Sequence, residues 1–479
     1  MKLIYNVGDK PKFSQLIVFA IQQLLAIMAA TLVVPVIIGN DMSPAAALVG
    51  AGVGTLVYLL FTKGKSPVFL GSSFAFISSM LAAFAGATTV ALGYLGLIIG
   101  AVLAGLVYVV IAIIVKFAGV GWLNKLMPAV VIGPTVSIIG LSLAGNAVGD
   151  LQEGGMTVNV LHKVIADGDF AYQYVAEPLA NPLLCVLCGL VTLAVTILAA
   201  TYGKKMVRLI PFILGILAGY VLAATLTVIG LATNTEALMI VDFSHFANLV
   251  EGGVTLNTFL SVPDFTFLTA FGAFGELSWT YVGTIAVAYI PVAFVVFAEH
   301  VADHKNISSI IEQDLLEDPG LSRTLLGDGV GSMAGALFGG CPNTTYGESV
   351  GCVAITGNAS VVTILAAAVL AIAVAFINPF VAFVNSIPAC VMGGVCVALY
   401  GFIAVSGLKM VQKVDLEQNK NLFVVSVILI CGIGGLTLTF GQVQITAIAV
   451  ALILGVLTNL LLKKEPTPEA EPSADVAED

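Results

Sequence analysis

Long apolar stretches, each close to the length of a membrane-spanning helix, follow one another along almost the whole chain. An α-helix needs about 20 apolar residues to cross a bilayer. Short polar breaks divide the chain into fourteen such segments: 14–39, 43–62, 67–86, 88–115, 126–146, 182–202, 207–231, 283–304, 324–340, 343–357, 360–381, 386–406, 421–439 and 443–462. The pattern predicts an all-α polytopic membrane protein.

The positions of the basic residues test this number of spans, because one span more or fewer would invert every later loop. With fourteen spans, all but one of the 18 Lys and Arg residues fall on the side of the N-terminus, and only Lys163, in the loop 147–181, falls opposite. We therefore expect both termini to lie in the cytoplasm.

Two of the segments do not look like ordinary spans. The stretch FLGSSFAFISS at 69–79 and the stretch CPNTTYGESVGCVAITG at 341–357 are short and rich in Gly, Ser and Thr. Each is the third span in a set of seven. Because seven is an odd number, the second set crosses the membrane in the opposite direction, and the pattern predicts 7+7 inverted repeats. Interrupted spans at matching positions of inverted halves are typical of a transporter site near the middle of the membrane. The alternative is chance, since the chain contains 50 glycines.

Each interrupted segment is predicted to be a short extended piece followed by a half-helix. We expect Val68–Ser72 to be extended before a helix starting near Ser73 and Phe74, and Thr344–Tyr346 before one starting near Gly347 and Glu348. The start of a helix offers unpaired N–H groups and the positive end of the helix dipole. Two such starts facing each other could donate to the carbonyl oxygens of a planar ligand.

Composition and charge exclude several classes of function. Hydrophobic residues make up 59% of the 479 and charged residues only 10%, which rules out a soluble enzyme. The net charge of −10 comes largely from loops and from the tail 465–479, which we expect to be disordered, and it offers no nucleic-acid surface. The first apolar run is too long for a signal peptide. Cys185 and Cys188 form a CxxC pair inside an apolar helix, where core packing is the better interpretation.

Glu299 and Glu348 are carboxylates within apolar surroundings. A charge at membrane depth costs at least about 2.5–3.5 kcal/mol, so each is a candidate functional residue. A carboxylate accepts hydrogen bonds from ring N–H groups, which suits a uracil-type ring, and two neighbouring buried carboxyl groups could also carry a proton. The alternatives are a helix cap for Glu348 and, for Glu299, a helix end near Lys305.

Further polar residues accompany the two glutamates. Asp303 follows Glu299 by one helical turn and could either orient a site partner or pair with Lys305. His300 and His304 share a similar spacing. They lack a third metal ligand, so we expect a polar helix face and no metal site.

Three more polar side chains are expected to support the site. Gln22 and Gln23 are amides inside the first span, able to bond across helices or to reach a ligand. Asp328 opens the ninth predicted span, where we expect an N-cap or a contact between domains.

The stretches AEHVADHKN (298–306), DPGLSRTLLGDG (318–329) and PNTTYGESVG (342–351) closely resemble the bacterial uracil permeases of the nucleobase–ascorbate transporter (nucleobase:cation symporter-2) family. The resemblance extends through 58–78 and 116–128 and covers nearly the whole membrane region. It implies a proton-coupled uracil symporter of the cytoplasmic membrane that works by alternating access and has no cofactor.

The resemblance also implies a core domain and a gate domain, with a homodimer formed through the gate. The core domain would comprise 1–117 and 283–382, the gate domain 118–235 and 383–464, with an external loop at 236–282 between them.

By position, the substrate carboxylates of the family fall on Glu299 and Glu348, and its ring-contacting aromatic residue falls on Phe74. Tyr346 and Gly347 fall on adjoining backbone contacts, with Ser73 beside them. Proton coupling would involve Glu299, Glu348 and Asp303.

The chain departs from the family pattern in several places. The usual Gln-His pair is Gln22-Gln23, Asn after the site glutamate is Ser349, and the basic residue that often closes the motif is Gly357. Some close uracil permeases have His at the position of Asp303. Alternatives to uracil are a purine such as xanthine, which relatives with Gln in place of Glu348 carry, and an anion exchanger of the same architecture. A membrane enzyme that uses His300 and His304 would need a metal.

Overall fold

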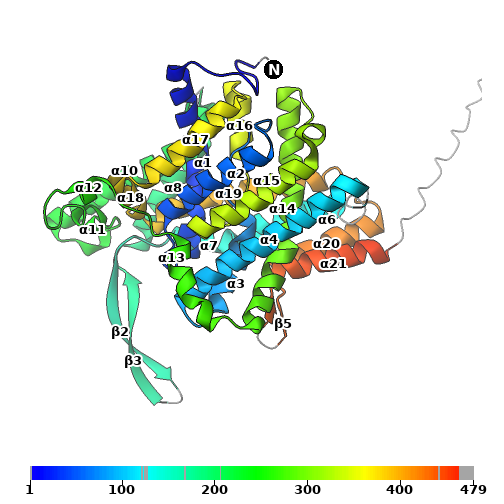
Figure 1. Ribbon diagram of the computed structural model, residues 1–479. Coiled ribbons are helices and arrows are strands. Elements are labelled where there is room, and N and C mark those ends of the chain that lie inside the picture. Colours follow the sequence, from blue (N-terminus) through cyan, green and yellow to red (C-terminus); the bar gives the residue numbers. More distant parts are fainter. Residues whose placement is uncertain are drawn as a thin grey trace, which may run out of the picture.

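The computed structural model describes residues 3–119, 122, 128–166, 169–204, 206–440 and 443–462, and these are mostly helical (Figure 1). The acidic tail predicted at 465–479 lies outside the described residues. Within the described chain, eight helices are long and apolar enough to cross a membrane: α1 (Phe13–Ile38), α2 (Pro44–Phe61), α4 (Val90–Ala118), α6 with α7 (Ala129–Ser142 and Ala144–Asp150), α8 (Pro182–Tyr202), α10 (Pro211–Thr233), α14 (Trp279–Ile311) and α19 (Ala389–Val411).

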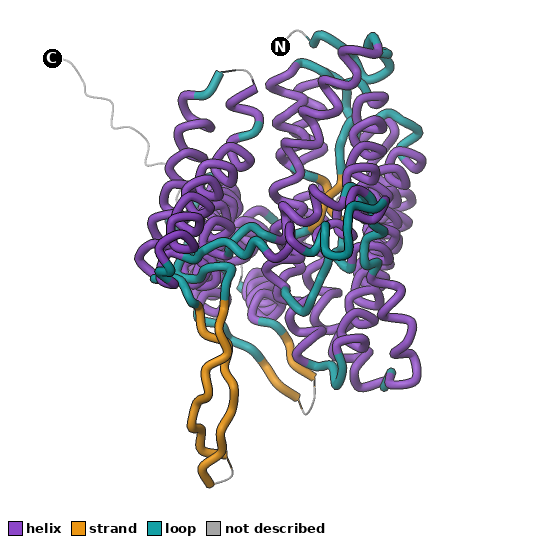
Figure 2. The backbone as a smooth tube through the Cα atoms, turned by 90° about the vertical axis from the view of Figure 1, so that its left-hand side faces the viewer, coloured by secondary structure: helices purple, strands orange, loops and turns teal. Residues whose placement is uncertain are grey.

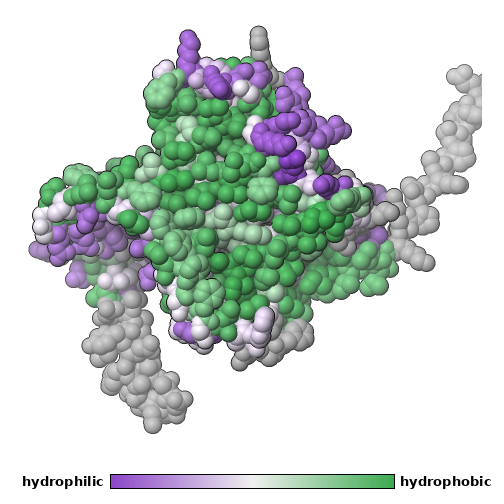
Figure 3. All heavy atoms as spheres, viewed as in Figure 1, coloured by the Kyte–Doolittle hydropathy of each residue, from purple (hydrophilic) through white to green (hydrophobic). Residues whose placement is uncertain are grey.

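The other six predicted spans contain helices that are shorter or less apolar. They are α3 (Ile77–Ala85), α15 (Leu321–Gly339), α16 (Gly347–Thr356), α17 (Val361–Ala375), α20 (Asn419–Ile433) and α21 (Ala447–Leu461). Every predicted segment therefore holds at least one helix, while the number of fourteen crossings stays a prediction. On the face shown in Figure 3, apolar side chains cover most of the helical surface, and hydrophilic residues gather mainly along the upper edge and on the left side.

The two interrupted segments pair with each other. Strand β1 (Leu70–Ser72) runs antiparallel to β4 (Asn343–Thr345), with Leu70 opposite Thr345 and Ser72 opposite Asn343. The short 3-10 helix η1 (Phe74–Phe76) with α3 follows β1, and α16 follows β4. The prediction of an extended piece followed by a helix is confirmed in both segments. Figure 2 shows the two short strands enclosed by helices.

Two groups of helices pack around separate centres (Figure 2). In the first, here the α14 group, α15 packs against α2 and α4, α17 against α1 and α2, and α14 against α4. In the second, the α19 group, α19 packs against α6 and α8, α10 against α8, and α20 against α6 and α21. These groups contain the helices expected for a core and a gate domain, whose boundaries stay a prediction.

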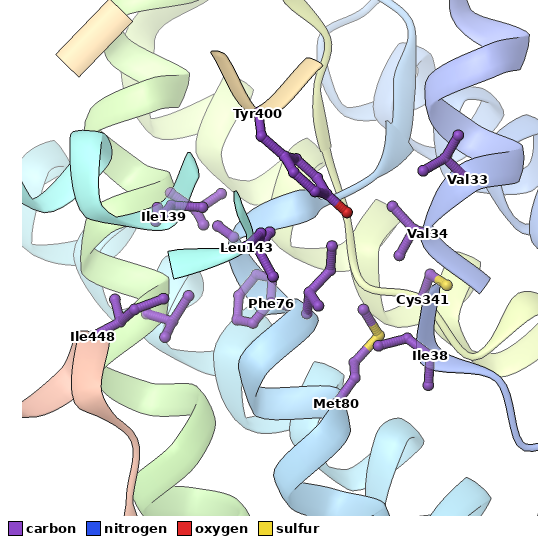
Figure 4. Close-up of a cluster of buried hydrophobic side chains, with 14 of the residues drawn as sticks. Val33, Val34, Ile38, Phe76, Met80, Ile139, Leu143, Cys341, Tyr400 and Ile448 are labelled. Atoms are coloured by element: carbon purple, nitrogen blue, oxygen red, sulfur yellow. The ribbon is translucent and has the colours of Figure 1, made fainter. Parts of the chain in front are cut away.

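A hydrophobic cluster fills part of the contact between the two groups (Figure 4). Phe76 and Met80 lie between residues of α1, such as Val34, and residues of α6, such as Ile139. Phe76 and Met80 are almost completely buried. Burial of these apolar side chains stabilises the contact between the two groups of helices. Because apolar packing is non-directional, it does not hold the two groups in one fixed orientation.

The remaining elements lie between and beyond the long helices. A hairpin of β2 (Thr157–Ala166) and β3 (Asp169–Pro178) projects away from the helices (Figure 1). The segment predicted as an external loop contains short helices. The short elements are α9 (Met206–Leu209), η2 (Glu236–Leu238), α11 (Ser244–Ala247), α12 (Leu256–Phe259), α13 (Thr266–Ala270), η3 (Phe271–Glu276), η4 (Leu316–Gly320), α18 (Asn378–Asn385), β5 (Leu438–Phe440) and β6 (Val443–Ile445).

Candidate functional site

A cavity of about 390 Å³, here called the site cavity, lies between the α14 group and the α19 group. The α14 group contributes Phe74, Ala75, Glu299, Ala302, Asp303, Thr344, Tyr346, Gly347 and Glu348 to its lining. The α19 group contributes Val136, Ile139, Phe212, Leu399, Phe402, Ile403, Ser406 and Met410. All three carboxylates predicted from the sequence therefore reach one cavity, and they share one wall of it.

Glu299 lies well inside α14, because that helix continues to Ile311 rather than ending near residue 304. The alternative in which Glu299 sits at a helix end is therefore wrong. Asp303, one turn further, accepts a hydrogen bond from the Thr345 hydroxyl at 2.8 Å. Of the two predicted roles for Asp303, the structure thus has the one that orients a neighbouring site segment, and within the described residues it has no ion pair with Lys305.

Glu348 is the second residue of α16, close to the positive end of that helix. The helix has no side-chain cap, since Tyr346 at the cap position makes no capping bond. Gly347 lies beside Asp303: a Cβ built on it would come within 3.9 Å of the Asp303 Oδ1 atom. The first turn of α16 thus brings N–H donors and a carboxylate to the cavity together.

Phe74 starts η1 on the same wall, again without a side-chain cap from the preceding Ser73. Its ring meets the ring of Tyr400 from α19 edge to face, with centroids 6.1 Å apart. Phe74 therefore offers an aromatic surface to the cavity and a contact to the opposite group of helices.

Tyr346 joins the two interrupted segments. Its hydroxyl donates to the Ser72 carbonyl oxygen at 2.7 Å, and its ring lies over Gly71. A Cβ at Gly71 would come within 2.4 Å of the ring, so only glycine allows this crossing. Strand β1 is further held by Thr55 of α2, whose hydroxyl oxygen accepts from the Leu70 N–H at 2.9 Å.

The residues expected to support the site lie behind its wall. The Gln23 amide donates to the Ser349 hydroxyl, which also accepts from the Phe69 N–H at 3.0 Å, so Gln23 ties α1 to α16. The Gln22 carbonyl oxygen and the Ser73 hydroxyl are buried without a hydrogen-bond partner in the described chain. None of these side chains lines the site cavity.

Asp328 does not cap a helix, because α15 starts at Leu321 and Asp328 lies in its interior. Nor does it join two domains. It is 1% exposed and bonds His300 of α14, with 2.6 Å between the His300 Nδ1 and Asp328 Oδ2 atoms, so both partners belong to the α14 group. Both predictions for Asp328 were wrong because Arg323 and the polar residues before it hid the true start of the helix.

His300 and His304 are completely buried and do not form an open polar face. His304 lies 2.6 Å from the Tyr58 hydroxyl, and the two imidazole rings stack with centroids 4.0 Å apart. Among the described residues no group of His, Cys, Asp and Glu side chains is arranged to hold a metal ion.

The sequence did not indicate the wall formed by the α19 group. Leu399, Phe402, Ile403, Ser406 and Met410 follow one another at helical spacing on α19. That spacing is visible in the sequence, but an apolar stripe that faces a cavity looks the same as one that faces lipid or a neighbouring helix.

A second cavity, of about 990 Å³, adjoins the first and shares Ala302 and Met410 with it. Lys116, Lys305 and Lys413 line this lysine cavity, and no carboxylate of the described chain does. The two cavities therefore carry opposite charge: carboxylates in the first and ammonium groups in the second.

Residues 14–441 match the model of a permease family of membrane proteins. The chain belongs to this family, and it is a multi-pass membrane permease rather than an enzyme. It is 39% identical to a uracil permease of Bacillus caldolyticus over 97% of this chain and 96% of the relative. It is 38% identical to a uracil permease of Bacillus subtilis over 98% of each chain. A uracil permease of Escherichia coli K12 is 34% identical over 96% of this chain and 94% of the relative.

Solved structures show the same fold at low identity. The transmembrane domain of the cyanobacterial bicarbonate transporter BicA has a TM-score of 0.56 and 12% identity, over 95% of this chain and all of that one. The murine anion transporter Slc26a9, in its inward-facing state, has a TM-score of 0.62 and 12% identity, over 95% of this chain and 69% of that one.

Proposed function

We propose that this protein imports uracil across the cytoplasmic membrane together with protons, by alternating access. The relatives named as uracil permeases match the chain over nearly its full length, which supports the same substrate here. The observation that carries the proposal is the joint presence of Glu299, Glu348 and two uncapped helix starts at one cavity.

The groups on this wall match the edge of a uracil ring. Uracil alternates N–H donors and C=O acceptors around its ring. Glu299 and Glu348 would accept from the ring N–H groups, and backbone N–H groups at the starts of η1 and α16 would donate to the ring carbonyls. Phe74 would contact the ring face. A neutral heterocycle can satisfy such a wall, whereas an anion would be repelled by it.

The three carboxyl groups also support proton coupling. Glu299, Asp303 and Glu348 line one cavity, and among the described residues no Lys or Arg side chain lines it with them. Three negative charges on the lining of one cavity repel one another, so a proton on at least one of them lowers the energy of the site. We propose that this proton travels with the substrate.

The route to the cytoplasm follows the lysine cavity. Its lysines lie near the C-terminal ends of α4, α14 and α19, on the side that the distribution of basic residues assigns to the cytoplasm. Because this cavity adjoins the site cavity, substrate released from the site would leave through it. The β1–β4 pairing supports fourteen spans in 7+7 inverted repeats, since inverted halves bring equivalent segments together antiparallel. The α14 group would be the core domain and the α19 group the gate domain that forms a homodimer.

Purified protein in liposomes tests the proposal. With the outside more acidic than the inside, we expect labelled uracil to accumulate, and a protonophore to abolish the accumulation without abolishing uracil binding. Absence of both uptake and binding would remove uracil as the substrate. Accumulation that survives the protonophore would remove proton coupling alone.

A purine substrate and an anion are the other candidates. The solved structures with the same fold are anion transporters, but at 12% identity the similarity supports only a shared fold and not a shared substrate. A thermal-shift panel of uracil, xanthine, hypoxanthine and sulfate separates these candidates: we expect stabilisation by uracil and none by sulfate.

A further inference from the structure

A very small cavity lies behind the site, where five elements of the α14 group meet. Its volume is about 10 Å³, and its lining comes from η1, α4, α14, α15 and β4. The polar residues in the lining are Tyr108, Asp328, Ser332 and Asn343. A space of about 10–15 Å³ holds one water molecule, provided that two to four polar groups surround it.

Two polar atoms at this cavity have no hydrogen-bond partner within the described chain: the Asp328 Oδ1 atom and the Tyr108 hydroxyl. Asp328 is 1% exposed and Tyr108 4% exposed. Leaving a buried polar group unpaired is costly, and native proteins rarely do so. Ser332 adds a third group: its oxygen accepts from the Asn343 N–H at 3.0 Å, which leaves its hydroxyl hydrogen for another acceptor.

The packing of two glycines brings these groups together. A Cβ built on Gly105 would meet the Gly329 carbonyl oxygen at 2.7 Å, and one built on Gly329 would meet the Tyr108 Cβ at 2.8 Å. Helices α4 and α15 therefore touch backbone to backbone, which places Tyr108 next to Asp328. Any side chain at either glycine would push the two polar groups apart.

The neighbouring hydrogen bonds show that the site is close to neutral. When the Thr324 hydroxyl donates to the Leu321 carbonyl oxygen at 3.1 Å, the same hydroxyl accepts from the His300 Nε2 atom 3.0 Å away. That nitrogen therefore carries a hydrogen, and one further proton is shared between His300 Nδ1 and Asp328 Oδ2. Wherever that proton lies, the pair has no net charge, which favours a neutral molecule over a cation.

We propose that one water molecule occupies this cavity and bridges the Asp328 Oδ1 atom, the Tyr108 hydroxyl and the Ser332 hydroxyl. The bridge completes a network from α4 through Asp328 to His300 on α14. His300 is next to Glu299 in the chain, so the network fixes the helix that carries two of the three site carboxylates. Tyr108, Asp328 and His300 are positioning residues, since none of them lines the site cavity.

Tyr289 provides a matched control, because its hydroxyl is also buried without a partner in the described chain but does not line the small cavity. Removing a hydroxyl that has no partner should leave stability unchanged or raise it. Removing one that binds a water takes a partner away from that water and from Asp328. We expect Tyr108→Phe to lower the melting temperature by about 1–2 °C, and Tyr289→Phe to leave it equal or higher.

A structure of the full-length protein at a resolution that reveals ordered water is the direct test. We expect density within hydrogen-bonding distance of both Asp328 Oδ1 and Tyr108 Oη in the wild type, and its loss in Tyr108→Phe. Absence of that density, or equal melting temperatures for the two Phe variants, would overturn the proposal. A melting temperature that rises with Na⁺ at constant ionic strength would assign the cavity to a cation instead and would overturn it equally.

The positioning role of Tyr108 is tested separately by measuring the KM for uracil, a test that rests on the proposed function. Loss of one hydrogen bond in the network should raise the KM for uracil by about fivefold in Tyr108→Phe, with the maximal rate retained, and Tyr289→Phe should keep the wild-type KM. An unchanged KM in Tyr108→Phe would refute the positioning role. If uracil were not transported at all, the density and melting experiments would still decide whether the water is there.

Discussion

The two walls of the site cavity differ completely in chemistry. The wall from the α14 group carries three carboxylates and two uncapped helix starts, whereas the described lining residues of the α19 group are apolar apart from Ser406. A ligand held by hydrogen bonds would stay with the first wall when the second moves. An apolar wall closes over a ring without specific bonds, so no hydrogen bond has to break when it moves away. The asymmetry supports the proposal that one group of helices binds the substrate and the other closes over it.

The strongest test of this difference removes the charge from the polar wall. We expect Glu299→Gln and Glu348→Gln each to reduce uracil uptake by at least about 100-fold, because each leaves a ring N–H opposite a group that can also donate. Radiolabelled uptake into liposomes measures it. Glu312→Gln is the control: Glu312 ends the same helix α14 in an exposed position and should transport normally. Normal uptake in either site variant would remove that residue from the site.

A second test disturbs the backbone that supports the polar wall, without changing a polar side chain. Gly71→Ala would place a methyl group 2.4 Å from the Tyr346 ring, so we expect a loss of about 1–3 kcal/mol in stability and uptake reduced by more than about tenfold. Gly351→Ala in α16 is the matched control, because nothing lies within 4 Å of the position that its Cβ would take. Melting curves and uptake should separate the two variants, and equal behaviour would show that the crossing of Tyr346 over Gly71 is unimportant.

A third, smaller effect is expected from Thr345→Val. This change removes the hydrogen bond from the Thr345 hydroxyl to Asp303 and keeps the shape of the side chain. One hydrogen bond to a charged group contributes about 1.5–3 kcal/mol, so the KM for uracil should rise roughly 10-fold or more. Thr345→Ser keeps the hydroxyl and should restore most of the affinity. If Ser and Val behaved alike, the hydrogen bond would have no part in binding.

The smallest effect is expected on the apolar wall. Ser406 carries the only hydroxyl among the described lining residues of that wall. If the wall merely closes the cavity, Ser406→Ala should change the KM for uracil by less than about twofold. A larger change would mean that the α19 group also binds the substrate through polar contacts. The division between the two walls would then no longer hold.

The sequence was informative where a residue contradicted its surroundings. Glu299 and Glu348 are charged within apolar runs, and the Gly, Ser and Thr residues around 71 and 344 interrupt helices. These anomalies led to the cavity wall of the α14 group and to both extended pieces.

Residues that agreed with their surroundings gave no such signal. Leu399 and Ile403 line the cavity but are ordinary in an apolar helix, so nothing distinguished them from lipid-facing residues. Asp328 was assigned to a helix start because a polar run precedes it, whereas its partner His300 lies on another helix. Pairing across helices depends on three-dimensional packing, which periodicity along one segment does not contain.

The pairing of Leu70 with Thr345 also has a consequence for synthesis of the chain. The first strand leaves the ribosome about 275 residues before its partner, and at about 5–20 residues per second this interval is on the order of tens of seconds. During that time the backbone of Leu70–Ser72 lacks the partner that satisfies it, in an environment where unpaired groups are costly. Strand β1 therefore stays unpaired until β4 has been synthesised, and until then its polar backbone groups need contacts with neighbouring helices or with the insertion machinery.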